Sequence, residues 1–304
     1  MATEQSIKID KQEIEEWFKT LQDQICSGLE RLDGEATFKE DLWTRVEGGG
    51  GRTRVIQKGK VFEKGGVSFS AVHGETPEKI LQSLNLSKSN FYATGISLVI
   101  HPVNPWVPII HMNTRYFEMD SGSCWFGGGI DLTPHYIDKE EAAFFHSQLK
   151  KTCDKHHPTF YPDFKKWADN YFFIPHREET RGIGGIFFDR LSEEQGRSLQ
   201  DVFKFVKDVG STFLPTYSYL VEKNKNRNYT SQEKKWQCIR RGRYVEFNLV
   251  YDKGTKFGLD TKGRTESILM SLPPLVEWEY NYIPEKESKE EETLTQLKKN
   301  IKWI

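Results

Sequence analysis

Two neighbouring segments of the chain carry polar side chains in a pattern typical of a binding surface. Residues 95–101 and 109–117 alternate apolar with polar residues, as β-strands with one buried face do. The linker 102–106 is short and rich in turn residues, so we expect a hairpin. The polar residues that would share one face of it are Ser97, His101, His111, Asn113 and Arg115. Folding does not require these residue types on a strand face, so we expect them to hold a polar or anionic ligand.

The residue types narrow the chemistry of this face. The guanidinium of Arg115 suits a ligand carboxylate, because its planar fork donates two parallel hydrogen bonds; the alternative is a pair with an acid of the protein. His111 and Asn113 resemble half of a facial-triad iron site, but that site takes a carboxylate where this chain has an amide. No histidine has HExxH or CxxC-like spacing, so local spacing gives no metal signal. Ser97 lacks the GxSxG context of a hydrolase nucleophile.

A second group of polar residues follows the segment 243–251, whose alternation predicts another strand. Asp252 would lie at the end of that strand, where a carboxylate can serve as a base or accept a hydrogen bond from a ligand N–H. Lys253, Lys262 and Arg264 lie in turn-rich loops behind it. We interpret these loops either as a second cationic wall for an anionic ligand or as ordinary β-turns.

The remaining periodicity predicts the elements that must position these groups. Helical spacing of apolar residues predicts a helix over 10–32, with Asp10 as N-cap and Gly34 as its stop. Further helices are predicted at 77–84, 138–156, 161–173 and 195–223, the last with Pro215 as a candidate interruption. Further strands are predicted at 53–57, 67–72, 124–132 and 182–189, and a charged helix from 285 to 304. This mixture predicts one α+β domain over residues 1–304, with a largely antiparallel sheet covered by helices.

Composition excludes several classes of protein. The 304 residues include 43 basic and 44 acidic side chains, and this balance argues against a nucleic-acid-binding or membrane-surface protein. The high aromatic content, with 20 Phe, 12 Tyr and 8 Trp, predicts a well-filled core and a large apolar pocket. The four scattered cysteines indicate free thiols in a reducing compartment. The beginning of the chain has no presequence pattern and no run is long enough to span a membrane, so we expect a cytoplasmic protein.

Several long motifs resemble one family, the oxygen-dependent coproporphyrinogen III oxidases. They begin with SNFYATGISLVIHPxNP from Ser89 and HxNxRYF from His111, and continue with WFGGGIDLTP from Trp125. The later ones are HRxExRGIGGIFFD from His176 and YVEFNLVYDxGTxFGL from Tyr244. They occur in the order typical of the family, and the resemblance runs from about residue 15 to about residue 282.

The resemblance implies a large antiparallel sheet flanked by helices on both faces, and a homodimer whose interface includes about residues 244–280. It implies oxidative decarboxylation of two propionates of coproporphyrinogen III, with dioxygen as co-substrate and no obligatory cofactor. As catalytic residues it implies His111, the proton donor, and Asp252. As substrate-binding residues it implies Ser97, Asn113, Thr114, Arg115, Lys262, Gly263 and Arg264. Bacterial relatives leave a divalent metal open, with His101, His111, His146 and His176 as ligands.

Two other functions remain open at this stage. One is a metal-dependent oxygenase that uses the four histidines, which activity of metal-free protein would exclude. The other is a tetrapyrrole carrier or sensor, which would bind the ligand tightly without consuming oxygen. The chain lacks flavin, nicotinamide and iron–sulfur signatures, and an electron-rich pyrrole can react with dioxygen once deprotonated, so we favour an oxidase without a redox cofactor.

Overall fold

A computed structural model describes residues 9–76, 81, 89–194, 197–260 and 263–304. Its centre is a seven-stranded sheet in which every neighbouring pair is antiparallel, in the order β1-β2-β3-β4-β5-β6-β9. These strands are β1 (Lys39–Thr44), β2 (Gly49–Gln57), β3 (Phe62–Glu75), β4 (Asn90–Pro102), β5 (Ile109–Met119), β6 (Cys124–Thr133) and β9 (Gly184–Leu191). A two-stranded sheet pairs β7 (Phe173–Ile174) with β8 (Glu179–Thr180), around the short helix η1 (Pro175–Arg177). The predicted α+β class and antiparallel sheet are confirmed.

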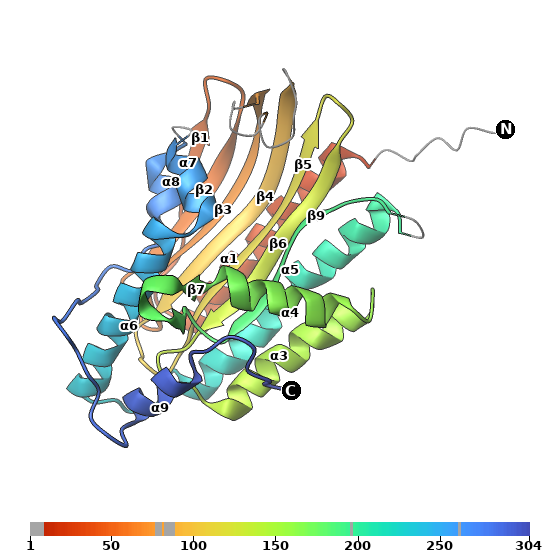
Figure 1. The fold of residues 1–304 in the computed structure, drawn as a ribbon. Coiled ribbons are helices and arrows are strands. Elements are labelled where there is room, and N and C mark those ends of the chain that lie inside the picture. Colours follow the sequence, from red (N-terminus) through yellow and green to blue (C-terminus); the bar gives the residue numbers. More distant parts are fainter. Residues whose placement is uncertain (1–8, 77–80, 82–88, 195–196, 261–262) are drawn as a thin grey trace.

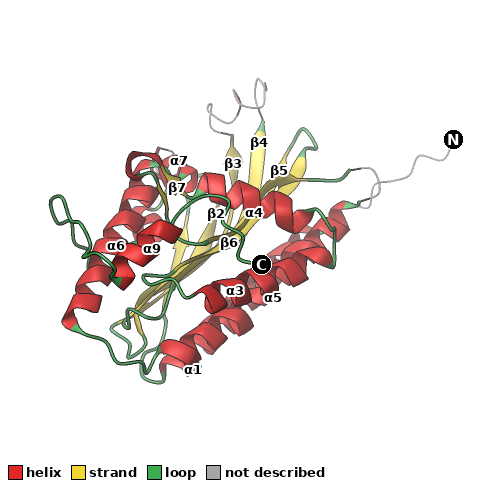
Figure 2. Cartoon of the chain, turned by 60° about the horizontal axis from the view of Figure 1, so that its bottom comes forward, coloured by secondary structure: helices red, strands yellow, loops and turns green. Residues whose placement is uncertain are grey.

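One face of the sheet forms the main core (Figures 1 and 2). The inward side chains of the central strands, such as Ile96, Leu98 and Met112, are fully or almost fully buried and belong to one cluster with two long helices. These helices are α1 (Lys11–Asp33) and α5 (Leu199–Asn224), and α3 (Lys139–Asp154) and α4 (Phe160–Tyr171) pack beside α5 and β9. The apolar strand positions thus alternate with those that face the other side.

The opposite face is covered only in part. Three helices lie on this side: α6 (Ser231–Val250), α7 (Lys253–Asp260) and α8 (Thr265–Leu269). Tyr244 of α6 packs on Val99 and Ile109 at one end of the sheet. The Ser267 hydroxyl of α8 lies 2.9 Å from that of Thr53 in β2. These contacts confirm helices on both faces and leave the middle of this face open for the predicted polar residues.

The helix predicted over 10–32 is confirmed as α1, with both predicted caps in place. The Asp10 side chain accepts a bond from the backbone N–H of Gln12, and Gly34 ends α1 with a φ of 80°. Helix α5 continues through Pro215 without interruption, because its buried face holds it against the core. The helix predicted at 77–84 lies almost wholly outside the described residues.

The strand predicted at 243–251 is wrong, because these residues form the last turns of α6. Alternating polar and apolar residues also fit a helix that is buried on two sides, and Trp236, Arg240, Tyr244 and Phe247 follow helical spacing along it. The Thr230–Glu233 capping box that starts this helix was the available signal.

The helix predicted over 285–304 is also shorter in the structure. Helix α9 covers only Lys289–Gln296, and residues 297–303 continue as non-helical chain. Leu297 is fully buried, so this part of the tail is not an exposed charged segment. The chain after α9 runs to α3 and α4 (Figure 1).

Candidate functional site

The hairpin of β4 and β5 places all five predicted residues on one face; His101 is buried there beneath α6, against Tyr244, and the other four lie in the open part. Ser97 lies opposite Asn113 in the register, and Gly95 lies opposite Arg115. Because side chains alternate along a strand, His111, Asn113 and Arg115 point to the same side as Ser97. This is the partly open face, away from α1, and all four residues are partly exposed.

His111 is held by a buried carboxylate of the next strand. Asp131 of β6 faces it in the register, and Asp131 Oδ1 lies 2.7 Å from His111 Nδ1. Asp131 is 1 % exposed and accepts two further bonds from Arg181 Nη2, at 2.9 and 2.8 Å. Burial raises the pKa of Asp131, but the charge of Arg181 and the bond from His111 outweigh burial and lower it. An ionised Asp131 keeps the proton on Nδ1, and His111 Nε2 makes no hydrogen bond within the described residues.

Arg181 is enclosed by aromatic rings. The centroids of Phe172, Tyr244 and Phe247 lie 4.4, 4.6 and 4.8 Å from its Cζ atom. Burial lowers the pKa of Arg181, but the charge of Asp131 outweighs it and the pKa is raised. The pair is therefore a buried ion pair, in which loss of one partner leaves the other charge uncompensated, at a cost of about 3–5 kcal/mol.

Arg115 extends over the open face and is paired at one end. Its Nη1 donates to Asn113 Oδ1 at 3.1 Å, and its Nη2 donates to Asp189 Oδ1 at 2.9 Å. The Arg115 and Asp189 side chains are 38 % and 32 % exposed. A Cβ atom at Gly127 would stand 2.5 Å from Asp189 Oδ1 and 3.0 Å from Arg115 Nη2, so this glycine makes room for the pair. A half-exposed pair of this kind is weak, and a ligand carboxylate can replace Asp189 or join it.

Apart from Asn113 and Arg115, two rows of strand positions on this side carry small residues. One row crosses β2 to β6 in register, through Thr53, Ser68, Ser97, Asn113 and Gly129. The next row contains Gly51, Ser70, Gly95, Arg115 and Gly127. Trp43 and Ser267 cover the β2 end of these rows at Thr53, whereas Ser68, Ser70 and Ser97 are partly exposed and project little from the sheet, so a flat ligand can approach the strands there.

Asp252 lies between the end of α6 and the start of α7, and not at the end of a strand as predicted. Its Oδ1 accepts a bond from the Tyr171 hydroxyl at 2.9 Å, and its Oδ2 accepts one from the backbone N–H of Thr255 at 2.6 Å. The carboxylate thus caps the start of α7. Its charge also raises the pKa of Arg181, after the larger effects of burial and Asp131, so Asp252 lies near the His111–Asp131–Arg181 group.

The other residues predicted to bind substrate are three in the loop after α7 and Thr114 of β5, and not all of them lie at the open face. Arg264 donates to Ser267 Oγ at 3.2 Å and to Asp41 Oδ2 at 2.5 Å, at the β1 side of the open face. The Gly263 backbone N–H donates to the Gly258 carbonyl at 2.8 Å. Lys262 lies outside the described residues. Thr114 departs from the prediction, because its side chain is fully buried on the opposite, core face of the sheet.

The four predicted metal ligands do not come together. His101 is buried beside α6 and its Nε2 lies 2.8 Å from the Ser271 carbonyl. His146 lies in α3, where its two ring nitrogens meet the Tyr161 hydroxyl and the Ile183 carbonyl, both at 3.0 Å. His176 in η1 contacts Glu246 at 2.8 Å. Within the described ranges, no group of three or more His, Cys, Asp or Glu could hold a metal ion, so these residues do not fit the predicted metal site.

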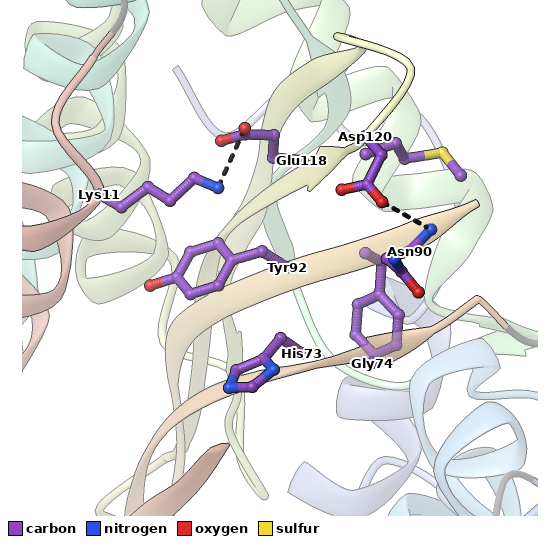
Figure 3. Close-up of a pocket in the computed structure, with 9 residues that line it drawn as sticks. Lys11, His73, Gly74, Asn90, Tyr92, Glu118 and Asp120 are labelled. Carbon is purple, nitrogen blue, oxygen red and sulfur yellow. Dashed lines mark hydrogen bonds and ion pairs between the residues drawn. The ribbon is translucent and has the colours of Figure 1, made fainter. Parts of the chain in front are cut away.

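Two hollows of about 440 Å³ each lie elsewhere, at the outer end of the sheet and beside α1. The first is lined by Lys11, His73, Tyr92, Glu118 and Asp120 among others, at the outer end of the sheet (Figure 3). Its central charges pair with each other, with Lys11 Nζ 3.0 Å from Glu118. The second adjoins it beneath α1. Neither is lined by a predicted site residue, so we assign no function to them.

Three residues of the site were not predicted as functional: Asp131, Arg181 and Asp189. The alternation in the strand predicted at 124–132 puts Asp131 on one face together with Gly127 and Gly129. Its contact with His111, however, depends on strand register, and Arg181 is 50 residues away in the chain. In the sequence, the local signal was an acidic residue among the glycines and apolar residues of a predicted strand.

Comparison with known proteins gives consistent matches. Residues 13–303 match the family described as coproporphyrinogen III oxidase. The chain is 51 % identical over 297 residues to the oxygen-dependent coproporphyrinogen-III oxidase, mitochondrial, of Rattus norvegicus, covering 93 % of this chain and 66 % of the rat protein. The corresponding human protein is 51 % identical over 298 residues, with coverage of 93 % and 65 %.

A bacterial relative matches over more of its length. The oxygen-dependent coproporphyrinogen-III oxidase of Prochlorococcus marinus (strain MIT 9312) is 47 % identical over 309 residues, covering 94 % of this chain and 90 % of that protein. The chain therefore spans about two thirds of the mammalian relatives and nine tenths of the cyanobacterial one. No helix among the described residues is long and apolar enough to cross a membrane.

Proposed function

The chain belongs to the coproporphyrinogen III oxidase family, and on this premise we propose that it converts coproporphyrinogen III to protoporphyrinogen IX in haem biosynthesis. In each of two steps, one propionic acid side chain and one dioxygen give one vinyl group, one carbon dioxide and one hydrogen peroxide. The observation that carries this proposal is the family match over residues 13–303, which includes every residue of the open face described above.

The shape and charge of the open face support a flat tetracarboxylate as substrate. The partly exposed serines Ser68, Ser70 and Ser97 form a low floor that suits a flat macrocycle, and Ser97 and Asn113 offer hydrogen bonds from it. Arg115 stands at one side of this floor and Arg264 near the other, where each can meet a propionate. We propose that Lys262 and Gly263 also contact propionates. The side chain of Thr114 is buried in the core, so Thr114 helps to hold the β5 strand in place and does not contact substrate through its side chain.

His111 and Asp252 are the groups that we propose for proton transfer. Asp131 accepts from Nδ1 of His111 and fixes the orientation of the ring, so Nε2 is the nitrogen that can exchange a proton with a ligand. Asp252 bonds the Tyr171 hydroxyl, and the adjoining Phe172 ring lies 6.1 Å from the His111 ring, which supports a common site. Asp252 would hold or deprotonate a pyrrole N–H, which makes the pyrrole electron-rich enough to react with dioxygen.

We propose that the reaction needs no bound redox cofactor, with dioxygen as co-substrate. The separate positions and separate partners of His101, His111, His146 and His176 favour acid–base and structural roles over a shared metal site. His101 and His146 are buried, and burial above all lowers the pKa of both, that of His146 to about 3. Neutral, hydrogen-bonded rings are the state expected of structural histidines.

A homodimer is the assembly that we propose. Seven of the thirteen exposed large apolar side chains in the described part of the chain lie between residues 249 and 283: Leu249, Val250, Leu259, Leu275, Trp278, Tyr280 and Ile283. This concentration overlaps the implied interface at about 244–280, and exposed apolar residues of this density are typical of a partner surface. A second copy of the chain is the proposed occupant.

A reducing compartment suits the four cysteines, which are all free thiols. We propose the cytoplasm, as for other proteins with unpaired buried cysteines, although the named mammalian relatives are mitochondrial.

The test mixes anaerobically prepared coproporphyrinogen III with metal-stripped protein and follows oxygen uptake and protoporphyrinogen IX together. We expect two dioxygen molecules consumed for each product without added metal. Activity restored only by one metal would overturn the cofactor-free reaction. Tight porphyrinogen binding without oxygen uptake would instead make the protein a carrier.

A further inference from the structure

The segment after α9 holds the backbone that carries Arg181. We define this C-terminal strap as residues 297–303. The Leu297 carbonyl accepts a bond from the Thr180 N–H at 3.0 Å, on the N-terminal side of Arg181. The Trp303 indole N–H donates to the Ile183 carbonyl at 3.1 Å, on its C-terminal side. The strap therefore holds the chain one residue before Arg181 and two residues after it.

The strap is itself fixed to α3 and α4. The Trp303 ring stacks on the His146 ring of α3, with centroids 6.2 Å apart and planes 18° apart. The Asn300 N–H donates to Asp169 at 2.9 Å, and Lys165 Nζ donates to the Ile301 carbonyl at 2.8 Å, both from α4. Figure 2 shows this end of the chain lying across these helices. An anchor on two packed helices makes the strap a rigid support.

From Arg181 the contacts lead directly to the open face. Arg181 bonds Asp131 at 2.8 and 2.9 Å, and Asp131 bonds His111 Nδ1 at 2.7 Å. Each contact is between buried or half-buried groups, so a shift of the 180–183 backbone is passed to the His111 ring. A misplacement of about 1 Å in a reacting group can lower a rate by about 10²-fold.

We propose that the C-terminal strap, through Trp303 and Leu297, positions Arg181 and thereby sets the orientation of the His111–Asp131 pair. Trp303 and Leu297 are positioning residues, because they touch neither the open face nor the substrate floor. The effect on turnover rests on the proposed function, but the effect on the backbone at 180–183 does not. Arg115 and Ser97 are not linked to the strap by any of these contacts, so substrate binding should be spared.

The test compares Trp303→Ala and Trp303→Phe with Trp106→Ala and Trp106→Phe in the full chain. Trp106 is a matched control, since it is also partly buried and its indole N–H donates to a backbone carbonyl, that of Asn228, at 3.1 Å. We expect Trp303→Ala to lower kcat by about tenfold or more with KM within about twofold. Trp303→Phe keeps the ring stack and should recover part of the loss. The Trp106 variants should keep the wild-type kcat.

Amide hydrogen exchange of the peptide around 179–184 gives a readout that does not depend on activity. It should become faster in Trp303→Ala and stay unchanged in Trp106→Ala. Faster exchange with wild-type kcat would overturn the positioning role, and unchanged exchange would overturn the strap itself. An equal kcat loss in the Trp106 variants would show a general stability effect and also overturn it. Absence of turnover in the wild type would overturn the proposed function only, and hydrogen exchange would then decide the strap.

Discussion

Nδ1 of His111 lies 2.7 Å from Oδ1 of Asp131, and that carboxylate is 1 % exposed and bonded twice by Arg181. A second histidine–aspartate contact in the chain joins His156 to Asp208 at 2.9 Å, but there the aspartate side chain is 40 % exposed. The two pairs have similar lengths and different surroundings. Of these two pairs, the buried one is the pair that can hold a histidine ring in a single orientation against a ligand.

Asp131→Asn should affect both activity and folding. An amide is a weaker acceptor for the His111 Nδ1–H and can also donate to that nitrogen, so the ring loses its fixed orientation and tautomer, and kcat should fall by about 10²-fold or more. It also leaves Arg181 buried without a counter-ion, which should lower the free energy of unfolding by about 3–5 kcal/mol. Urea unfolding and steady-state kinetics measure the two effects. Asp208→Asn is the matched control, with a change of at most about 1 kcal/mol; equal losses in both variants would contradict the role of burial.

Arg115→Ala should weaken substrate capture with little effect on stability. Loss of a charge-assisted contact to a propionate should remove about 1.5–3 kcal/mol of binding free energy. This corresponds to a fall in kcat/KM of roughly 10- to 150-fold, mainly through a higher KM. Its pair with Asp189 is half-exposed, so the free energy of unfolding should change by less than about 1 kcal/mol. Arg197→Ala removes another arginine from a pair with an exposed glutamate and serves as control. Unchanged kinetics in Arg115→Ala would exclude the clamp.

His146 should make the protein less stable in acid. Burial lowers its pKa in the folded protein to about 3, while the unfolded chain has a value of about 6.5. The unfolded state therefore binds more protons between these values, so stability falls as pH falls, by up to about 1.4 kcal/mol per pH unit for one group. Urea unfolding at pH 6.5 and 4.5 should show a loss about 2 kcal/mol smaller in His146→Gln than in the wild type. Equal losses would mean that His146 takes up its proton in the folded state.

The apolar surface at 249–283 should hold a dimer together. Tyr280 and Ile283 are 98 % and 75 % exposed, so Tyr280→Lys with Ile283→Lys should not disturb the folded subunit. If this surface is the interface, buried lysines should raise the dimer dissociation constant by at least about tenfold. Sedimentation velocity across a concentration series measures it. Leu42→Lys, at another exposed apolar site, should leave the dissociation constant unchanged; a wild-type monomer at all concentrations would refute the dimer.

The sequence alone was sufficient for the features that depend on local periodicity. Alternation in 95–101 and 109–117 correctly places Ser97, His101, His111, Asn113 and Arg115 on one face, because a strand has only two faces, but it did not reveal that α6 buries His101. The caps Asp10 and Gly34 likewise mark the ends of α1, since capping bonds form within a few residues. Thr114 could have been excluded by the same alternation, as it is adjacent to two residues that face the ligand side.

Tertiary structure decided what depends on distant parts of the chain. Residues 243–251 alternate like a strand, yet packing on both sides makes them the end of α6. The acid that holds His111 is selected by the register of β5 with β6, and Arg181 reaches it from 50 residues further along. Similarly, four histidines that resemblance groups into one metal site are separated onto different elements. Periodicity determines which face a side chain is on, whereas its neighbour across that face is set by long-range packing.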